Sequence, residues 1–315
     1  MCLLHYFDHN ATAPMSPVAR QVWMDASQEL PGNPSSLHRI GSRADKALED
    51  ARQELASILG CTPLDVVWTS SASESNNAIW YHLSQTLDPE KTVWVSAIEH
   101  PCCLDAARHW LGDRCRWIPV TTTGEVDVSW MEANLETQQP GVVCVMAANN
   151  ETGTLQPVSE IGRLCRDHGV LFHTDAVQWF GKEPVEHIHQ FEADLVTVCG
   201  HKCHGPKGAG ALFIRSPLLP EKILFGGAHE NERRAGTENV AGIAGLVQAL
   251  EMHARTPVFR ASPIEQATLT CRRILESLEG VTLLSPESGS LVNTLTFTVE
   301  NADSIGLLAA LDLVD

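Results

Sequence analysis

The chain has 315 residues, of which 43% are hydrophobic and 19% are charged. This length and composition are typical of a soluble globular protein with more than one domain. The 22 Lys and Arg residues against 39 Asp and Glu residues give a formal net charge of −17. Such a balance argues against a nucleic-acid groove and against docking on anionic membranes, so we expect neither as a partner.

No stretch reaches the roughly 18 apolar residues of a membrane span. The N-terminal sequence MCLLHYFDHN lacks the basic region and apolar run of a signal peptide. Ten scattered cysteines do not form the dense framework of a small secreted scaffold, so we expect a cytoplasmic protein with reduced thiols. Cys199 and Cys203 have metal-like spacing, but no second Cys/His pair matches it, and we predict no metal site.

Apolar residues recur every three or four positions over residues 37–59, before Gly60, and predict a helix. Short apolar runs typical of buried strands follow, and helical segments such as Val158–His168 separate several of them. This alternation predicts an α/β fold with a mostly parallel sheet covered by helices. The predicted strands are Val66–Thr69, Thr92–Ile98, Trp117–Val120, Val142–Ala147, Val170–Thr174, Leu195–Cys199 and Ala211–Ile214.

The pattern changes after about residue 255, where RTPVFRASPIEQ reads as a junction. A helix through Leu269–Leu278, strands at Val281–Leu284 and Val292–Val299, and a short helix at Ser304–Leu311 predict a smaller α+β unit. We therefore divide the chain into an N-terminal segment (1–15), a large domain (16–255) and an incomplete small domain (256–315). We expect the small domain to expose apolar surface.

Functional residues in parallel sheets lie on loops beyond the carboxyl ends of strands. Residues 70–76, Ser-Ser-Ala-Ser-Glu-Ser-Asn, lead from a strand into a helix and suit a phosphate group, although an ordinary helix N-cap has the same pattern. His100 follows the next strand, and Asn150 lies in a later turn. Each of these, taken alone, is equally typical of a structural residue.

Asp175 and Lys202 follow two further predicted strands. A carboxylate at the end of a buried strand requires a partner, which is either a salt-bridging cation or a protonated pyridine nitrogen. Lys202 stands among glycines, where desolvation lowers an amine pKa as a Schiff-base lysine requires, whereas Lys207 lies in a Pro-Lys-Gly turn. We call the serine-rich segment at residues 70–76 the hydroxyl loop. Its order along the chain with His100, Asp175 and Lys202 predicts a site for pyridoxal 5′-phosphate.

Further motifs follow the same order as in one known family, from about residue 5 to the end. On these motifs the chain resembles the cysteine desulfurases (the NifS/IscS-like group) of the class V aminotransferase superfamily. The motifs are YFDHNATAP at residues 6–14, GNPSSLH at 32–38, EH at 99–100, NNETG at 149–153, HTDAVQ at 173–178, GHK at 200–202 and RAGTEN at 234–239.

The resemblance implies a large domain of fold type I of the pyridoxal-phosphate enzymes. It implies that Lys202 binds the cofactor and moves protons, that His100 stacks on the ring, and that Asp175 pairs with the ring nitrogen. The other implied roles are phosphate binding by Ala72, Ser73, His201 and Cys199 (where the family usually has Ser), approach to the ring hydroxyl and substrate by Asn150 and Gln178, approach to the substrate by Asn33, and contact of Thr237 with the other subunit's phosphate.

The activity that the resemblance implies is conversion of L-cysteine to L-alanine, with the sulfur passed on as a persulfide. A homodimer with shared sites is implied as well. A sulfur-acceptor or scaffold protein is a further expected partner, as in iron–sulfur cluster assembly and other sulfur metabolism.

Family members continue past the segment matching Ser304–Leu311 into a loop bearing the nucleophilic Cys, and then to an Arg that binds the substrate carboxylate. This sequence ends at Asp315, before both. We therefore expect cofactor capture and Cα deprotonation, with Cys102, Cys103 and Cys203 as candidate substitutes for the nucleophile. The alternatives are a non-catalytic pyridoxal-phosphate-binding homologue or scaffold, and a different class V aminotransferase-type reaction.

Overall fold

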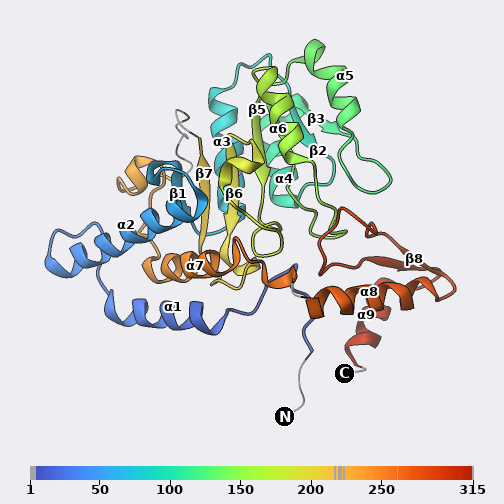
Figure 1. Cartoon of the computed structure of the whole chain (residues 1–315). Helices are drawn as coiled ribbons and strands as arrows, with labels where there is room; N and C mark the ends of the chain where they lie inside the picture. Colours follow the sequence, from blue (N-terminus) through green and yellow to red (C-terminus); the bar gives the residue numbers. More distant parts are fainter. Residues whose placement is uncertain (1–4, 216–217, 219–221, 223, 261, 314–315) are drawn as a thin grey trace.

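One large sheet organises the computed structural model, which describes residues 5–215, 218, 222, 224–260 and 262–313 (Figure 1). Its seven strands run in the order β1-β7-β6-β5-β4-β2-β3. Strands β2 to β6 pair in parallel, and β7 is antiparallel to both of its neighbours, which confirms the predicted mostly parallel α/β sheet. The strands are β1 (Val66–Thr69), β2 (Val93–Ser96), β3 (Cys115–Ile118), β4 (Val142–Cys144), β5 (Leu171–Asp175), β6 (Leu195–Cys199) and β7 (Gly210–Ile214).

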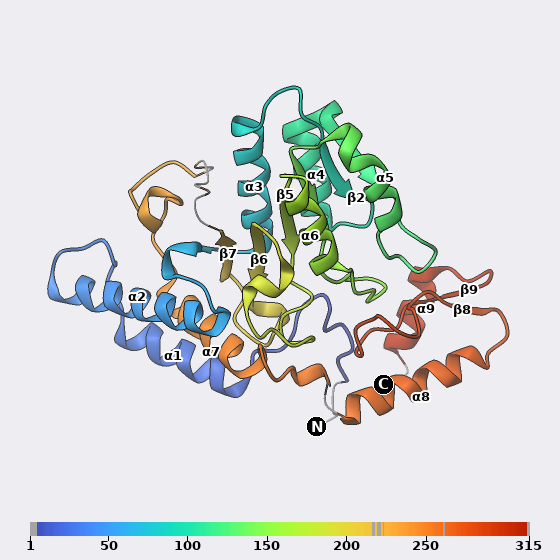
Figure 2. The same ribbon diagram turned by 45° about the horizontal axis from the view of Figure 1, so that its top comes forward.

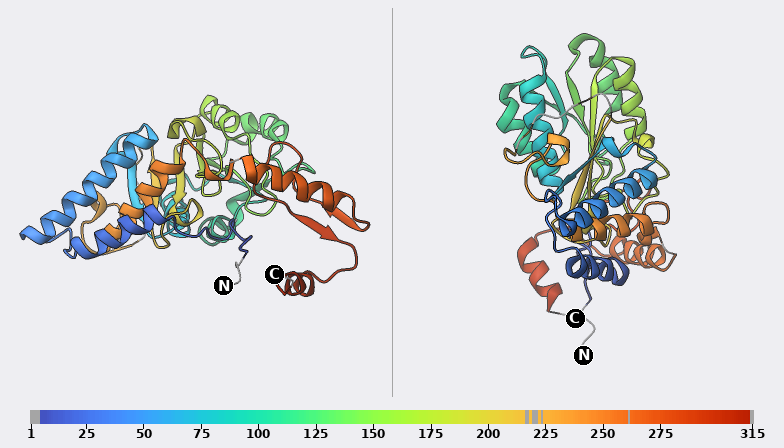
Figure 3. Two further views of the ribbon diagram at one scale, coloured as in Figure 1. Left: turned by 60° about the horizontal axis from the view of Figure 1, so that its bottom comes forward. Right: turned by 90° about the vertical axis from the view of Figure 1, so that its left-hand side faces the viewer.

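Helices cover both faces of this sheet, as the edge-on view of Figure 3 shows. Apolar side chains of α3 (Ala72–Thr86) and α4 (Pro101–Leu111) form one core layer with the strands. The opposite core layer is formed by α2 (Arg39–Leu59), α5 (Val128–Gln138), α6 (Val158–Asp167) and α7 (Val240–His253). Burial on both faces explains why the strands have apolar runs rather than alternating patterns.

The bounds of the long helix α2 follow from its capping residues. The predicted helix over 37–59 begins at Arg39 instead, because the His38 side chain accepts a hydrogen bond from the Gly41 N–H and caps the first turn. Gly60 ends it in the left-handed conformation at φ 66°, which glycine adopts at little cost. A shorter helix, α1 (Pro17–Glu29), packs against α7. No helix in the described part of the chain is long and apolar enough to cross a membrane.

The C-terminal segment forms a small unit that projects from the body of the molecule (Figure 2). It contains α8 (Ser262–Glu276), the antiparallel pair β8 (Val281–Leu283) and β9 (Phe297–Val299), and α9 (Ser304–Asp312). Its large apolar side chains are exposed, as expected, at Leu269, Ile274, Leu278, Leu284, Ile305, Leu308 and Leu311. The domain boundary between residues 255 and 256 stays a prediction.

Several predicted strands have wrong bounds: those predicted at Thr92–Ile98 and Val142–Ala147 are the shorter β2 and β4, and two others differ for a visible reason. The strand predicted at Trp117–Val120 is β3, two residues earlier, because Val120 leaves the sheet to bridge Val126. Most of the strand predicted at Val292–Val299 is a loop, since only Phe297–Val299 pairs with β8. The Thr296 hydroxyl donates to the Glu151 carbonyl, so this loop docks on the large domain, which no apolar pattern reveals.

A buried ion pair joins α2 to the segment before α7. The Arg52 guanidinium makes two hydrogen bonds to the Glu230 carboxylate, of 2.7 and 2.9 Å, and one Glu230 oxygen also accepts from the Trp68 N–H of β1. The side chains are 3% and 0% exposed. Removal of either partner leaves an uncompensated charge in the interior.

We predict that Arg52→Met lowers the free energy of unfolding by about 3 kcal/mol or more, because Glu230 stays buried without its cation. Lys46→Met is the matched control, since the Lys46–Asp50 pair on the same helix is largely exposed. Its effect should be within about 0.5 kcal/mol. Urea unfolding of both variants measures the difference, and equal effects would contradict the role given to the buried pair.

Candidate active site

A cavity of about 170 Å³ opens where the loops after β1, β2, β5 and β6 meet. Asp175 ends β5, Lys202 follows β6, and His100 follows β2. Strand β1 runs parallel to β6 because both are antiparallel to β7, so its loop reaches the same edge of the sheet. The loops predicted from the strand-end rule therefore converge on one site.

One end of the cavity is the N-terminus of α3. Ala72, Ser73 and His201, the residues expected to bind a phosphate, line it. The Ser71 hydroxyl caps the helix by accepting from the Glu74 N–H. Main-chain N–H groups of Ala72 and His201 point at the Cys199 sulfur, and burial raises the pKa of that thiol to about 11. Cys199 thus lies beneath this end and does not line the cavity.

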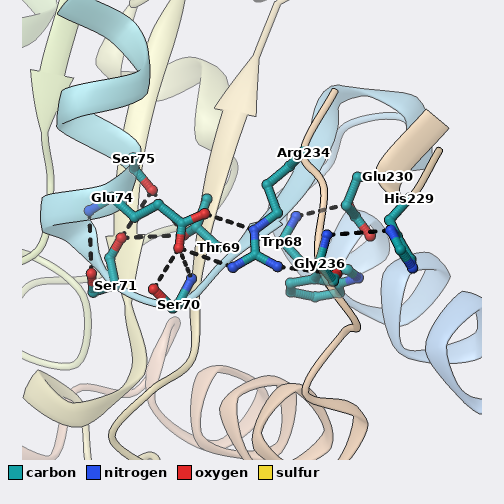
Figure 4. A network of polar contacts seen from close by, with 10 residues as sticks. All are labelled: Trp68, Thr69, Ser70, Ser71, Glu74, Ser75, His229, Glu230, Arg234 and Gly236. Carbon is teal, nitrogen blue, oxygen red and sulfur yellow. Dashed lines mark hydrogen bonds and ion pairs between the residues drawn. The ribbon is translucent and has the colours of Figure 1, made fainter. Parts of the chain in front are cut away.

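An ion pair holds the hydroxyl loop in place, as Figure 4 shows. Arg234 makes two hydrogen bonds to the Glu74 carboxylate, of 2.7 and 3.1 Å. Glu74 in turn accepts from the main-chain N–H of Ser70, at 2.8 Å, and from its hydroxyl. Deeper in the loop the Thr69 and Ser75 hydroxyls lie 2.9 Å apart. The loop is therefore held by one ion pair and several hydrogen bonds that involve no ligand.

Asp175 also lines the cavity and is buried. One of its oxygens accepts from Asn76 Nδ2 at 2.8 Å, and the other accepts from the Val177 N–H. Burial raises the pKa of Asp175 to about 6. Asn76 is itself fixed, because its Oδ1 accepts from the Thr197 hydroxyl at 2.7 Å. The carboxyl group thus has two neutral donors, and no cation among the described residues forms a salt bridge with it.

His100 caps the N-terminus of α4. Its Nδ1 accepts from the Cys102 N–H at 3.2 Å and lies 3.0 Å from the Cys102 sulfur. The hydrogen bond with Cys102 is the main cause of the raised pKa of His100. The imidazole lines the cavity together with Asn150 and Gln178, as predicted.

Lys202 is held by the N-terminal segment. Its Nζ donates to the Asn10 carbonyl oxygen, which also accepts from Gln178 Nε2 at 2.8 Å. Burial lowers the pKa of Lys202. A half-buried amine with a lowered pKa is the form that reacts with carbonyl groups.

A second lysine, Lys182, lies behind this one and is 0% exposed. Its Nζ donates to Asn10 Oδ1 at 2.7 Å and to Gln178 Oε1. Burial, followed by the charge of Lys202, lowers the pKa of Lys182 to about 7. In the part of the chain that the structure describes, this amine has amide oxygens as acceptors and no carboxylate partner.

Asn10 therefore connects the site with the small unit. Its Nδ2 donates to the Asn150 carbonyl at 3.0 Å and to the Thr294 hydroxyl at 2.9 Å, and Asn293 Nδ2 lies 3.3 Å from its Oδ1. Displacement of the Asn10 segment would disturb Lys202, Gln178 and the loop at 292–296 together.

Besides Cys199, two further predicted residues lie outside this cavity. Asn33 is exposed between α1 and α2, where its Oδ1 accepts from the Ser35 N–H, and Thr237 is exposed before α7. Of the three candidate thiols, Cys103 and Cys203 are fully buried, whereas Cys102 lines the cavity.

Sequence reasoning assigned no role to Asn10, Glu74, Asn76 or Lys182. Glu74 and Asn76 stand in the hydroxyl-loop motif, so their place near the site was visible, but their partners were not. Lys182 follows Asp175 by seven residues in an apolar stretch, where a lone lysine signals a buried amine.

Comparison with known proteins agrees with this geometry. The chain matches the aminotransferase class-V family over residues 5–313. It is 35% identical over 304 residues to a cysteine desulfurase of Nostoc sp., which covers 96% of this chain and 74% of that protein. A solved NifS-like protein from Rickettsia africae has a TM-score of 0.89 at 31% identity, covering 98% of this chain and 85% of that one.

Another solved structure, SspA in complex with cysteine, has a TM-score of 0.83 at 29% identity, covering 98% of this chain and 87% of that one. Fold and family match together place the chain in the aminotransferase class-V family. Within that class the chain belongs to the cysteine desulfurase family, as its motifs predicted.

We predict that the free energy of unfolding rises with pH above 7 because of Lys182. Its pKa falls from an ordinary 10.5 to about 7 in the folded chain, so between these values the unfolded chain binds one more proton. Excess proton binding by the unfolded state gives stability that increases with pH, by up to about 1.4 kcal/mol per unit.

In denaturant titrations, the free energy of unfolding of the unmodified protein minus that of Lys182→Met should therefore increase from pH 7 to pH 9. Lys207→Met, which replaces an exposed lysine nearby, should give a difference that does not change with pH. A constant difference for Lys182→Met would show that its amine is not desolvated.

Proposed function

We propose that the cavity binds pyridoxal 5′-phosphate and that the chain uses it to deprotonate L-cysteine at Cα. The observation that carries this proposal is the placement of Lys202 and the buried Asp175 in one cavity with the N-terminus of α3. The donor set fits the cofactor, because a helix N-terminus suits a phosphate, a carboxylate suits a pyridinium nitrogen, and a desolvated amine suits an aldehyde. When bound, the cofactor supplies an electron sink for the Cα carbanion.

The phosphate end would be formed by main-chain and side-chain donors of Ala72, Ser73 and His201. Burial lowers the pKa of His201 to about 4, so its imidazole is neutral, and its Nδ1 lies 3.0 Å from the Thr12 hydroxyl. Arg234 and Glu74 keep the loop in position from behind. Thr237 and Asn33 would serve a partner's cavity in a homodimer, since neither lines the cavity of its own chain.

Asp175 would hold a proton on the ring nitrogen. Its pKa of about 6 without a ligand reflects burial, and a cation beside it would favour the ionised form. Asn76 orients the carboxylate by donating to one oxygen. His100 lines the same cavity and would cover the ring.

Lys202 would hold the cofactor aldehyde covalently and afterwards, as a free amine, accept the substrate Cα proton. The lowered pKa supplies the neutral amine that both tasks require. Asn10 and Gln178 orient the amine, and the nearby Lys182 disfavours its protonated form by charge repulsion.

L-cysteine is the proposed substrate because the relatives are named cysteine desulfurases and SspA was solved with cysteine. The overall reaction of the family type converts L-cysteine and an acceptor thiol into L-alanine and a persulfide. We assign cofactor capture and Cα deprotonation to the residues above, and sulfur acceptance to none of them. A separate acceptor or scaffold protein is the expected partner for the sulfur.

We predict that the protein with pyridoxal 5′-phosphate exchanges the Cα proton of L-cysteine for deuterium in D₂O. Lys202→Ala should lower this rate at least about 100-fold, because it removes the proton acceptor. Lys207→Ala is the matched control, since Lys207 does not line the cavity, and should exchange at nearly the original rate.

Mass spectrometry of the recovered amino acids distinguishes the outcomes. Exchange without L-alanine would indicate a site that lacks its sulfur acceptor, whereas L-alanine formation would indicate complete turnover. Binding of the cofactor without any exchange would favour a non-catalytic homologue and contradict the proposal.

A further inference from the structure

The cavity contains a thiol that the proposed function does not use. Cys102 lines it, and its sulfur lies 3.0 Å from His100 Nδ1 and accepts from Asn76 Nδ2 at 3.2 Å. Its residue stands in the first turn of α4, where main-chain N–H groups and the helix dipole favour negative charge. Three separate features of the fold thus favour the thiolate.

Charged and titratable groups face Cys102 from several elements. Hydrogen bonds from the Cys103 thiol first, and then from His100 and Asn76, lower the pKa of Cys102 to about 4, against the effect of burial. Asp175 and Glu99 oppose the negative charge, but burial raises the pKa of Glu99 to about 8, so that group is neutral at pH 7. The imidazole of His100, 3.0 Å from the sulfur, has a pKa raised chiefly by its hydrogen bond with Cys102, and this contact favours the thiolate.

The other thiols around the site differ from Cys102 in exposure and in the direction of their pKa shift. Cys103, Cys144 and Cys203 are 0% exposed, and their pKa values are raised. Burial in apolar surroundings keeps such thiols protonated and unreactive. Among the cysteines that the structure describes, Cys102 alone lines the cavity.

We propose that Cys102 is a site of reversible modification by small electrophilic sulfur compounds, and that this modification and a bound pyridoxal ring exclude each other. The second half rests on the proposed function. The thiolate attacks the sulfenyl sulfur of a thiosulfonate, a new S–S bond forms, the bond to the sulfonyl sulfur breaks, and a sulfinate leaves with the electron pair. An added thiol restores Cys102 by disulfide exchange.

Mutual exclusion follows from where the sulfur lies. Asn76 Nδ2 donates both to Cys102 and to Asp175, so the thiolate adjoins the carboxylate proposed to pair with the ring. His100, the residue proposed to cover the ring, is the other neighbour of the sulfur. An added methylthio group would occupy part of a cavity of only about 170 Å³, between these residues.

The first test measures modification of the cofactor-free protein by methyl methanethiosulfonate as a function of pH, with peptide mass spectrometry. The rate at Cys102 should be nearly constant from pH 5 to pH 8, because its thiolate is already formed. A thiol of ordinary pKa, about 8.5, reacts about tenfold faster with each pH unit in that range. Cys271, which is exposed on α8, is the reference thiol in the same digest.

Replacement of His100 tests whether Cys102 reacts because it is a thiolate or only because the reagent can reach it. In His100→Gln the rate at Cys102 should rise with pH, while the rate at Cys271 keeps its profile. A Cys102 rate that rises in parallel with Cys271 in the unmodified protein would overturn the inference.

The second test measures uptake of pyridoxal 5′-phosphate before and after treatment, by absorption of the protein-bound cofactor. Treated protein should lose most of its uptake and regain it with dithiothreitol, whereas Cys102→Ser should show the same uptake treated and untreated. If the protein of original sequence still binds the cofactor fully after treatment, the inferred mutual exclusion is wrong, but the proposed function is not affected. Untreated protein that binds none would instead overturn the proposed function, while the pH profile would still decide on the thiolate.

Discussion

The carbonyl oxygen and side chain of Asn10 hold the candidate site together. They accept hydrogen bonds from Lys202, Gln178 and Lys182, and they donate to the loops at 150 and 294. A segment near the N-terminus thus fixes residues from β5 and β6 as well as the small unit. Because two lysines share one asparagine in a desolvated place, each disfavours the charge of the other, and the amine that faces the cavity is kept reactive.

Opposite charges are placed at a distance from these lysines rather than beside them. Asp175 has neutral donors, Glu74 is paired with Arg234 behind the hydroxyl loop, and Glu230 is paired with Arg52 beneath β1. Among the described residues, Lys182 has no carboxylate partner. This separation leaves a buried acid and a reactive amine in one cavity, which is the combination that a pyridinium aldehyde requires.

Strand-end reasoning located Lys202, Asp175 and His100 because short apolar runs reveal the strands and parallel strands bring their following loops to one edge. It could not reveal Asn10 or Lys182, since their partners depend on how a distant N-terminal segment packs. The loop at 292–296 was predicted as a strand because its apolar residues resemble one, while docking on the Glu151 loop prevents pairing. Asn33 and Thr237 carry family motifs yet lie outside their own cavity, so the sequence identified them without indicating what they contact.

The central claim is that Lys202, rather than Lys182 or Lys207, binds the cofactor aldehyde. Borohydride reduction of the protein with pyridoxal 5′-phosphate fixes the linkage, and peptide mass spectrometry locates it. These three lysines end separate tryptic peptides, so each modification gives a distinct missed cleavage. The account predicts a phosphopyridoxyl group on Lys202; its location on Lys182 or Lys207, or its absence, would contradict the account.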